Sequence, residues 1–171
     1  MSAHAARFVV DRLATKPGVR TELIDIATLP LTTADAGEAT KDAALSTTLT
    51  HADGLVIVTP EYNRSIPGLL KHVLDGYLKE YIHKAVGLVG VSAGRFGGVR
   101  AIENVLPVLR ELGLVTIFWD VNIGPVSKVF GEDGRLLDPS LIKPTDKFLA
   151  ELIWMARTLR YGRESVPLES A

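Results

Sequence analysis

Short apolar runs alternate along this chain with segments whose apolar residues recur at helical spacing. The runs that predict strands are 21–26, 55–59, 85–91 and 114–121. The segments that predict helices are 3–14, 38–50, 67–81, 99–112 and 144–161. Strands and helices that alternate in this way are joined by right-handed crossovers into a parallel sheet covered on both faces. The sequence therefore predicts an α/β fold, a doubly wound parallel sheet in three layers, α/β/α.

Length and composition narrow the classes of partner. The chain has 171 residues, the size of one domain, and we expect a single domain over 1–162 with a tail at 163–171. Its 19 basic and 20 acidic residues leave a net charge of −1, which argues against a nucleic-acid partner. The absence of cysteine excludes disulfides and thiolate metal sites, and no pair of histidines has metal-binding spacing. No apolar run is long enough to span a membrane, so we expect a cytoplasmic protein.

A polar loop follows the predicted strand 55–59. It reads Thr59-Pro60-Glu61-Tyr62-Asn63-Arg64-Ser65-Ile66-Pro67-Gly68. In open α/β sheets the loops at the carboxyl ends of the strands form the ligand crevice. A carboxylate, a phenol, a carboxamide and a guanidinium in succession are able to pack an aromatic ring and hydrogen-bond its edge. A connecting loop with no ligand is the alternative that these residues alone leave open.

A second loop follows the predicted strand 85–91 and opens a helix. It reads Ser92-Ala93-Gly94-Arg95-Phe96-Gly97-Gly98, and its N–H groups are placed to bind an anion or the polar edge of a ring. Residues 90–94 also match the Gly-x-Ser-x-Gly pattern of a hydrolase nucleophile. In that fold the histidine base follows the serine, whereas all four histidines of this chain precede Ser92. A serine hydrolase is therefore disfavoured.

Both loops resemble those of one family. The string Thr-Pro-Glu-Tyr-Asn-x-Ser-x-Pro-Gly-x-Leu-Lys resembles the flavin-contacting loop of the NADPH-dependent FMN reductase family, and Ser-x-Gly-x-x-Gly-Gly resembles its second flavin loop. The resemblance covers roughly 2–161 and implies a flavodoxin-like fold. It also implies an enzyme that passes a hydride from NADPH or NADH through bound FMN to a second acceptor, such as a flavin, a quinone, an azo compound or a metal ion. The flavin supplies this chemistry, so we expect no catalytic side chain.

The resemblance also implies which residues bind the cofactor. Those expected against the isoalloxazine are Pro60, Glu61, Tyr62, Asn63 and Ser65; those expected at its pyrimidine side are Ser92, Ala93, Gly94, Arg95, Phe96 and Gly97. Arg64 and Arg95 are able to attract the phosphates of the nicotinamide cofactor, but surface arginines in solvent are more common and are the default interpretation.

The chain departs from the family at its start. The family's apolar first strand and its Gly-Ser-x-Arg phosphate loop are missing, and Ser2 stands where that loop would end. Three explanations are open: a start codon placed too far downstream, which we favour; a truncation; or a rearranged sheet in which 21–26 pairs directly with 55–59. The missing loop also leaves open a different function, a flavin-free binding and dimerisation module.

The predicted helix 67–81 carries a wide apolar stripe. One row is Leu69, Val73, Tyr77 and Tyr81, and the neighbouring row is Leu70, Leu74 and Leu78. The resemblance implies that subunits pair through this helix into a homodimer or tetramer. Deep packing of the helix within one subunit is the alternative.

Overall fold

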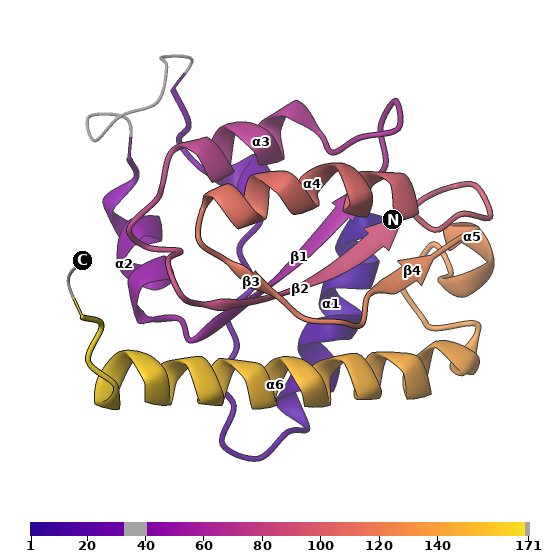
Figure 1. The fold of residues 1–171 in the computed structure, drawn as a ribbon. Coiled ribbons are helices and arrows are strands. Elements are labelled where there is room, and N and C mark those ends of the chain that lie inside the picture. Colours follow the sequence, from indigo (N-terminus) through magenta and orange to yellow (C-terminus); the bar gives the residue numbers. More distant parts are fainter. Residues whose placement is uncertain (33–40, 170–171) are drawn as a thin grey trace.

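The computed structural model describes residues 1–32 and 41–169, which form a sheet with helices on both faces (Figure 1). The helices are α1 (Ser2–Ala14), α2 (Ala43–His51), α3 (Gly68–Asp75), α4 (Val99–Glu111), α5 (Val126–Val129) and α6 (Ile142–Ser165). The strands are β1 (Gly54–Pro60), β2 (Ala85–Val91), β3 (Val115–Thr116) and β4 (Val121–Ile123). Short 3-10 helices lie at Ile26–Thr28 and Pro139–Leu141.

The strands pair in parallel around β2. β1 lies on one side of β2, in register from Gly54 opposite Ala85 to Pro60 opposite Val91. β3 and β4 lie on its other side. Every residue of β2 is buried, as a continuous apolar run in a doubly covered parallel strand should be. The predicted parallel α/β sheet is confirmed.

Two hydrophobic clusters lie between the sheet and its helices, one on each face. One contains buried residues of α1 and α6, and the other contains buried residues of α2, α3 and α4. Because successive side chains of a strand point to opposite faces, Val56 packs against the first cluster and Ile57 against the second. The three-layer arrangement is confirmed, and Figure 1 shows α3 and α4 on one side of the sheet and α6 on the other.

The strand predicted at 21–26 is wrong. Residues 19–25 have no strand pairing, and the Asp25 side chain accepts a hydrogen bond from the Ala27 N–H, which starts a 3-10 turn. Ile24 and Ile26 instead pack their side chains against the cluster under α2, α3 and α4. Direct pairing of this segment with 55–59 is likewise wrong, since among the described residues β1 pairs with β2 alone.

The single strand predicted at 114–121 is interrupted. The Ile117 N–H still bonds to Val86 on β2, but the next N–H, that of Phe118, donates to Oε1 of Glu151 on α6 over 3.0 Å. This detour leaves Phe118 79% exposed. The chain rejoins β2 only at β4.

α3 is shorter than the helix predicted at 67–81. It ends at Asp75, where the Gly76 N–H bonds back to the Val73 carbonyl. Tyr77 and Tyr81 lie beyond the helix and are nevertheless buried in the same cluster as α3. Most of the wide apolar stripe is thus buried within the subunit, and its exposed members are Leu69 and Leu78, at 41% and 50%.

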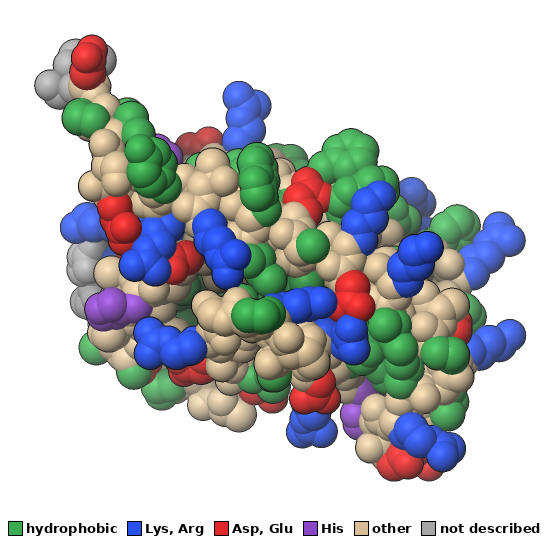
Figure 2. Space-filling model, turned by 90° about the horizontal axis from the view of Figure 1, so that it is seen from below, with side chains coloured by type: hydrophobic (Ala, Val, Ile, Leu, Met, Phe, Trp, Pro, Cys, Tyr) green, Lys and Arg blue, Asp and Glu red, His purple; other side chains and the backbone are tan. Residues whose placement is uncertain are grey.

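α6 is longer than predicted. It continues to Ser165, so residues 163–165 are helical rather than part of a tail. The helix predicted at 38–50 begins at Ala43 in the structure, capped by Asp42, and residues 38–40 lie outside the described ones. The face seen from the α6 side carries hydrophobic side chains interspersed with Lys and Arg (Figure 2). No helix in the described part of the chain combines the length and apolarity that crossing a membrane needs.

Candidate functional site

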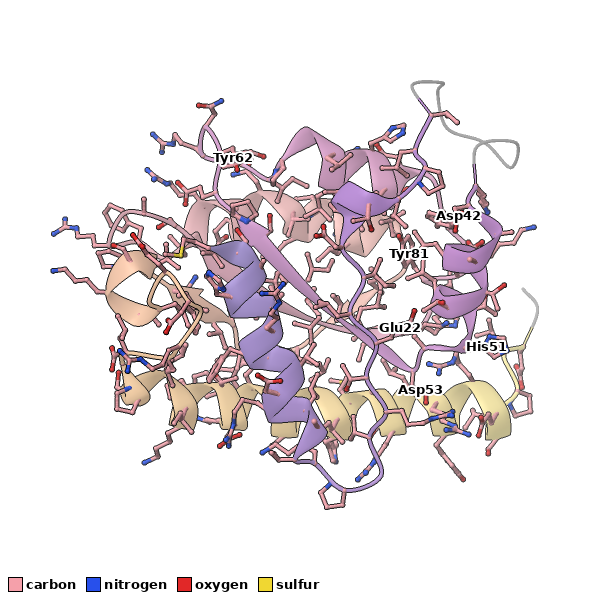
Figure 3. The ribbon with its side chains drawn as sticks, turned by 180° about the vertical axis from the view of Figure 1, so that it is seen from behind. Glu22, Asp42, His51, Asp53, Tyr62 and Tyr81 are labelled. Carbon is pink, nitrogen blue, oxygen red and sulfur yellow. The ribbon has the colours of Figure 1, made fainter. Side chains whose placement is uncertain are left out.

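Two loops begin side by side at the carboxyl edge of the sheet. Because Pro60 lies opposite Val91, the loop after β1 (61–67, the first loop) and the loop after β2 (92–98, the second loop) start at the same level. Tyr62 marks this edge in Figure 3, at the opposite end of β1 from Asp53. α1 also begins near this edge (Figure 1). The fold therefore brings together the two segments that the sequence singled out.

The first loop contains a tight two-residue turn. The Tyr62 N–H donates to the Ser65 carbonyl and the Ser65 N–H to the Tyr62 carbonyl, each over 2.9 Å. Asn63 and Arg64 at the tip have φ of 50° and 68°, the left-handed conformation that such hairpin turns require. Asparagine tolerates this conformation, whereas arginine does so less readily. The turn leaves the side chains of Tyr62, Asn63 and Arg64 exposed.

Glu61 lies at the base of the first loop and is almost buried. Its N–H donates to the Val91 carbonyl over 3.0 Å, which ties the loop to the end of β2. Its side chain is 6% exposed and accepts a hydrogen bond from Arg100 Nε at 2.6 Å. The other carboxylate oxygen, Oε2, is buried and has no hydrogen-bond partner among the described residues. Buried acceptors are normally satisfied, so this unpartnered oxygen is an exception that calls for an explanation.

The second loop is anchored at both ends. The Ser92 N–H donates to the Ile123 carbonyl and the Ser92 carbonyl accepts from the Val126 N–H, both at 3.0 Å. Gly97 has φ of 59° and packs so closely on Asn122 that a Cβ would lie 2.8 Å from the Asn122 carbonyl carbon. Gly97 is therefore buried, and its lack of a side chain lets the loop pack against Asn122. Gly97 and Gly98 thus allow the loop to pack closely on the ends of the strands.

The middle of the second loop is open to solvent. Ala93, Gly94, Arg95 and Phe96 are exposed, and a Cβ placed on Gly94 would meet nothing within 4 Å. The Phe96 ring is 53% exposed and has two guanidinium groups within cation–π range, those of Arg95 at 5.1 Å and Arg100 at 5.4 Å from its centroid. The edge thus offers exposed aromatic rings with positive charge beside them.

The sequence analysis missed two residues of α4. Arg100 bonds to Glu61, and the Asn104 side chain donates to the Arg64 carbonyl over 3.1 Å. Both contacts join residues about 40 positions apart, so no local motif marks them. The only available signal was topological, because the first turns of a helix after one strand lie beside the loop after its neighbour.

Ser92 does not have the surroundings of a catalytic serine. Its hydroxyl donates to the Gly94 carbonyl over 2.8 Å. His51 and His72 bond to backbone carbonyls of Thr47 and Thr32, away from this loop. A nucleophilic serine needs a histidine base within hydrogen-bond reach, and none is bonded to Ser92 in the described part of the chain.

Comparisons with known proteins identify the family of this chain. The model of the family described as NADPH-dependent FMN reductase matches residues 1–125. The NAD(P)H-dependent FMN reductase PA1204 of Pseudomonas aeruginosa is 32% identical over 152 residues, 84% of this chain and 82% of that protein. A quinone reductase of Pseudomonas putida is 32% identical over 139 residues, 74% of this chain and 75% of that protein. The NADPH azoreductase of Bacillus sp. strain OY1-2 is 40% identical over 90 residues, 49% of this chain and 50% of that protein.

A solved structure has the same fold. FerB from Paracoccus denitrificans, a flavoenzyme NAD(P)H:(acceptor) oxidoreductase, superposes with a TM-score of 0.72 at 24% identity, over 92% of this chain and 90% of that chain. The family match covers well over half of the sequence and includes both loops. The chain belongs to the NADPH-dependent FMN reductase family.

Proposed function

We propose that this chain is an FMN-dependent oxidoreductase that takes a hydride from NADPH or NADH and passes electrons to a small-molecule acceptor. The observation that carries the proposal is the pair of loops within the family match, held at one edge of the sheet with exposed rings beside them and, in the described part of the chain, an unpartnered buried acceptor at the base of the first loop. The acceptor classes are free flavin, a quinone, an azo compound or an oxidised metal ion. Relatives named as quinone reductase and azoreductase support the second and third.

The residues at this edge fit a flavin ring. An isoalloxazine has flat apolar faces and a polar edge with an N–H donor. The exposed rings of Tyr62 and Phe96 suit contact with an apolar face of the ring, and Oε2 of Glu61 is an acceptor without a partner among the described residues. The space beside Gly94 lets a ligand approach the backbone closely. On this reading Pro60, Ser65, Ser92, Ala93 and Gly97 shape the two loops.

FMN, when bound, supplies the transfer of the hydride. The chain's own residues bind the ring, orient it and leave one side open to the second substrate, so none of them acts as a proton donor in the proposal. Arg64 and Arg95 place positive charge at the rim, where it attracts the phosphates of NADPH or NADH. At the start of α1 the His4 N–H already donates to the Met1 carbonyl over 3.0 Å, which leaves the Ser2 and Ala3 N–H groups near the same edge to suit the FMN phosphate.

A homodimer or tetramer through 67–81 is part of the proposal. Leu69 and Leu78 are the exposed remainder of the apolar stripe, and Ile82 beside them is 39% exposed. Light scattering at micromolar concentration tests this assembly, and a monomer there contradicts it. A cytoplasmic location is proposed as well, because reduced nicotinamide nucleotides are kept inside cells.

The test is an anaerobic visible absorption titration of the purified chain, first with FMN and then with NADPH. Saturable perturbation of the flavin bands, followed by bleaching, is the expected result. A chain that is folded by circular dichroism but leaves the flavin bands unchanged would contradict the proposal and favour the flavin-free binding module. NADH in place of NADPH and each acceptor class in turn then resolve the substrates.

A further inference from the structure

Arg100 contacts both loops of the proposed flavin site. It lies in the first turn of α4, 42% exposed, and its Nε donates to Oε1 of Glu61 at the base of the first loop, 2.6 Å away. A terminal nitrogen of the same guanidinium forms an ion pair with the same oxygen. The guanidinium carbon also lies 5.4 Å from the centroid of the Phe96 ring in the second loop, within cation–π range. One side chain thus joins two loops that are far apart in sequence.

α4 holds the tip of the first loop as well. Asn104, one turn after Arg100, donates from Nδ2 to the Arg64 carbonyl at 3.1 Å and to the Arg100 carbonyl at 2.8 Å. The turn at Tyr62–Ser65 is closed by its own hydrogen bonds, but these do not fix its direction relative to the second loop. The contacts from Arg100 and Asn104 do, because both start from a packed helix.

We infer that Arg100 is a positioning residue that sets the spacing of the two flavin loops, with Asn104 as its support. The inference rests on the proposed function. A planar ring that two loops contact together needs both loops at a fixed separation before it binds, since any ordering at binding is subtracted from the affinity. Arginine suits the task because its planar fork bonds a carboxylate while its face stacks on a ring.

An ordinary ion pair that only stabilises the fold is the competing explanation. Half-exposed pairs contribute little to stability, and the geometry here is unusual for that role. The Glu61 carboxylate is 6% exposed, yet it gives only one of its oxygens to Arg100 and leaves the other without a partner among the described residues. Arginine–carboxylate pairs frequently engage both oxygens in a fork, so this pair leaves part of the carboxylate's bonding capacity unused.

The experiment compares Arg100→Gln, Arg100→Lys and Asn104→Ala with wild type. FMN affinity is measured by quenching of flavin fluorescence, and the visible circular dichroism of FMN is recorded at saturation, which reports how rigidly the ring is held. The matched control is Arg110→Gln, an exposed arginine in the last turn of the same helix. Thermal unfolding without FMN verifies that each variant folds.

Arg100→Gln is expected to weaken FMN binding about tenfold to a hundredfold, the range for losing a charged hydrogen bond. It should also reduce the circular dichroism of the bound flavin, which a purely stabilising pair would leave unchanged. Arg100→Lys should recover part of the affinity, and Asn104→Ala, which leaves no buried charge unpaired, should weaken binding a few-fold. Arg110→Gln should match wild type.

Three results would overturn the inference, and they are distinct from one another. If wild type binds FMN and Arg100→Gln binds it equally well with the same circular dichroism, the positioning role fails while the proposed function stands. If folded wild type binds no FMN, the proposed function and the inference fall together. An equal effect from Arg110→Gln would assign the change to the helix as a whole and also overturn the positioning role.

Discussion

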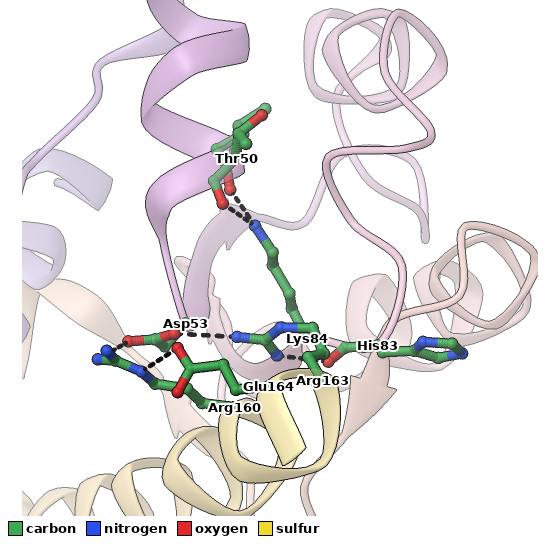
Figure 4. A network of polar contacts seen from close by, with 8 residues as sticks. Thr50, Asp53, His83, Lys84, Arg160, Arg163 and Glu164 are labelled. Carbon is green, nitrogen blue, oxygen red and sulfur yellow. Dashed lines mark hydrogen bonds and ion pairs between the residues drawn. The ribbon is translucent and has the colours of Figure 1, made fainter. Parts of the chain in front are cut away.

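The Nζ of Lys84 donates to the carbonyl oxygen of Thr50 over 2.7 Å, which joins the start of β2 to the end of α2 (Figure 4). The same nitrogen bonds to the Leu49 carbonyl, and Lys84 is 5% exposed. The last carbonyls of a helix have no hydrogen-bond donors within it. At the end of α2 the buried Lys84 ammonium supplies these donors. Nearby, Asp53 pairs with Arg160 and Arg163 of α6. The amino end of the sheet is thus cross-linked from both layers, far from the proposed flavin site.

Replacing Lys84 with methionine is expected to destabilise the protein by about 1–3 kcal/mol, the cost of leaving buried carbonyls unsatisfied. Burial, followed by the nearby charge of Arg163, lowers the pKa of Lys84, so the folded protein disfavours its positive charge. The stability lost in Lys84→Met therefore comes from the hydrogen bonds rather than from the charge. Urea unfolding at pH 7 measures the change, with the exposed Lys128→Met as control. An equal effect at both lysines would contradict the assignment. FMN affinity should stay at the wild-type value in both variants.

The lowered pKa of Glu80 predicts how the stability of the protein changes at low pH. Burial opposes its ionisation, but hydrogen bonds from the Ser46 hydroxyl at 2.8 Å, from Lys41 and from the Leu78 N–H outweigh burial and lower its pKa to about 2. A carboxyl whose folded pKa lies below its unfolded value of 4.5 stabilises the protein above pH 4.5 and loses that contribution as pH falls towards 2. From the shift, the contribution is about 3 kcal/mol at pH 7 and about 1.4 kcal/mol at pH 3.

Glu80→Gln should therefore be less stable than wild type at pH 7, and the difference should shrink steadily from pH 4.5 to pH 2. Urea unfolding across this range is the measurement, and the exposed Glu132→Gln is the control. A difference that is the same at pH 3 as at pH 7 would show that ionisation of Glu80 has no part in its effect.

A substitution at Gly94 should change FMN binding without changing the stability of the fold. A Cβ there meets nothing within 4 Å and its φ is not positive, so Gly94→Ala should fold with wild-type stability. If the ring of FMN approaches the loop at this point, the added methyl group should weaken binding fivefold or more, roughly the cost of about 1 kcal/mol for overpacking. Gly162→Ala is the matched control, because Gly162 on α6 is equally open. Flavin fluorescence titration that gives equal affinities for the two variants would remove Gly94 from the contact surface.

Local sequence signals were enough for the elements that frame the site. β2 matches its predicted range of 85–91 because it is a continuous apolar run. α4 and α1 agree within one residue because each combines a clear helical period with a glycine or proline shortly after its end. The two loops could be located because each follows a predicted strand. That they lie at the same edge could be predicted from the rule that the carboxyl ends of parallel strands meet at one edge of the sheet.

The errors arose where distant residues decide the local structure. The break after Ile117 depends on Glu151, 33 residues from Phe118, which takes the N–H that a continuous strand would use. The helix predicted at 67–81 failed because Tyr77 and Tyr81 keep helical spacing although the helix ends before them. Arg100 went unnoticed for the same reason, since its partner Glu61 is 39 residues away.

Asn63 offers the sharpest test of the first loop, because its substitution has to respect the backbone. Its φ of 50° would strain a leucine, so a loss of binding in Asn63→Leu would mix a distorted turn with a lost contact. Glycine accepts the left-handed conformation and removes only the carboxamide. Asn63→Gly should fold normally and bind FMN about twofold to tenfold more weakly, the range for one neutral hydrogen bond.

Arg64→Gly is the matched control at the neighbouring position of the same turn, where φ is 68°. This variant also places glycine at a left-handed position of the turn but leaves the Asn63 side chain in place, so its FMN affinity should equal that of wild type. If Arg64 attracts the phosphates of the nicotinamide cofactor, this variant should instead raise the KM for NADPH without changing kcat, because charge at the rim acts on binding before transfer. Wild-type FMN affinity in Asn63→Gly would show that the tip of the loop does not contact the ring, and would leave Tyr62 and Glu61 as the ligands of the first loop.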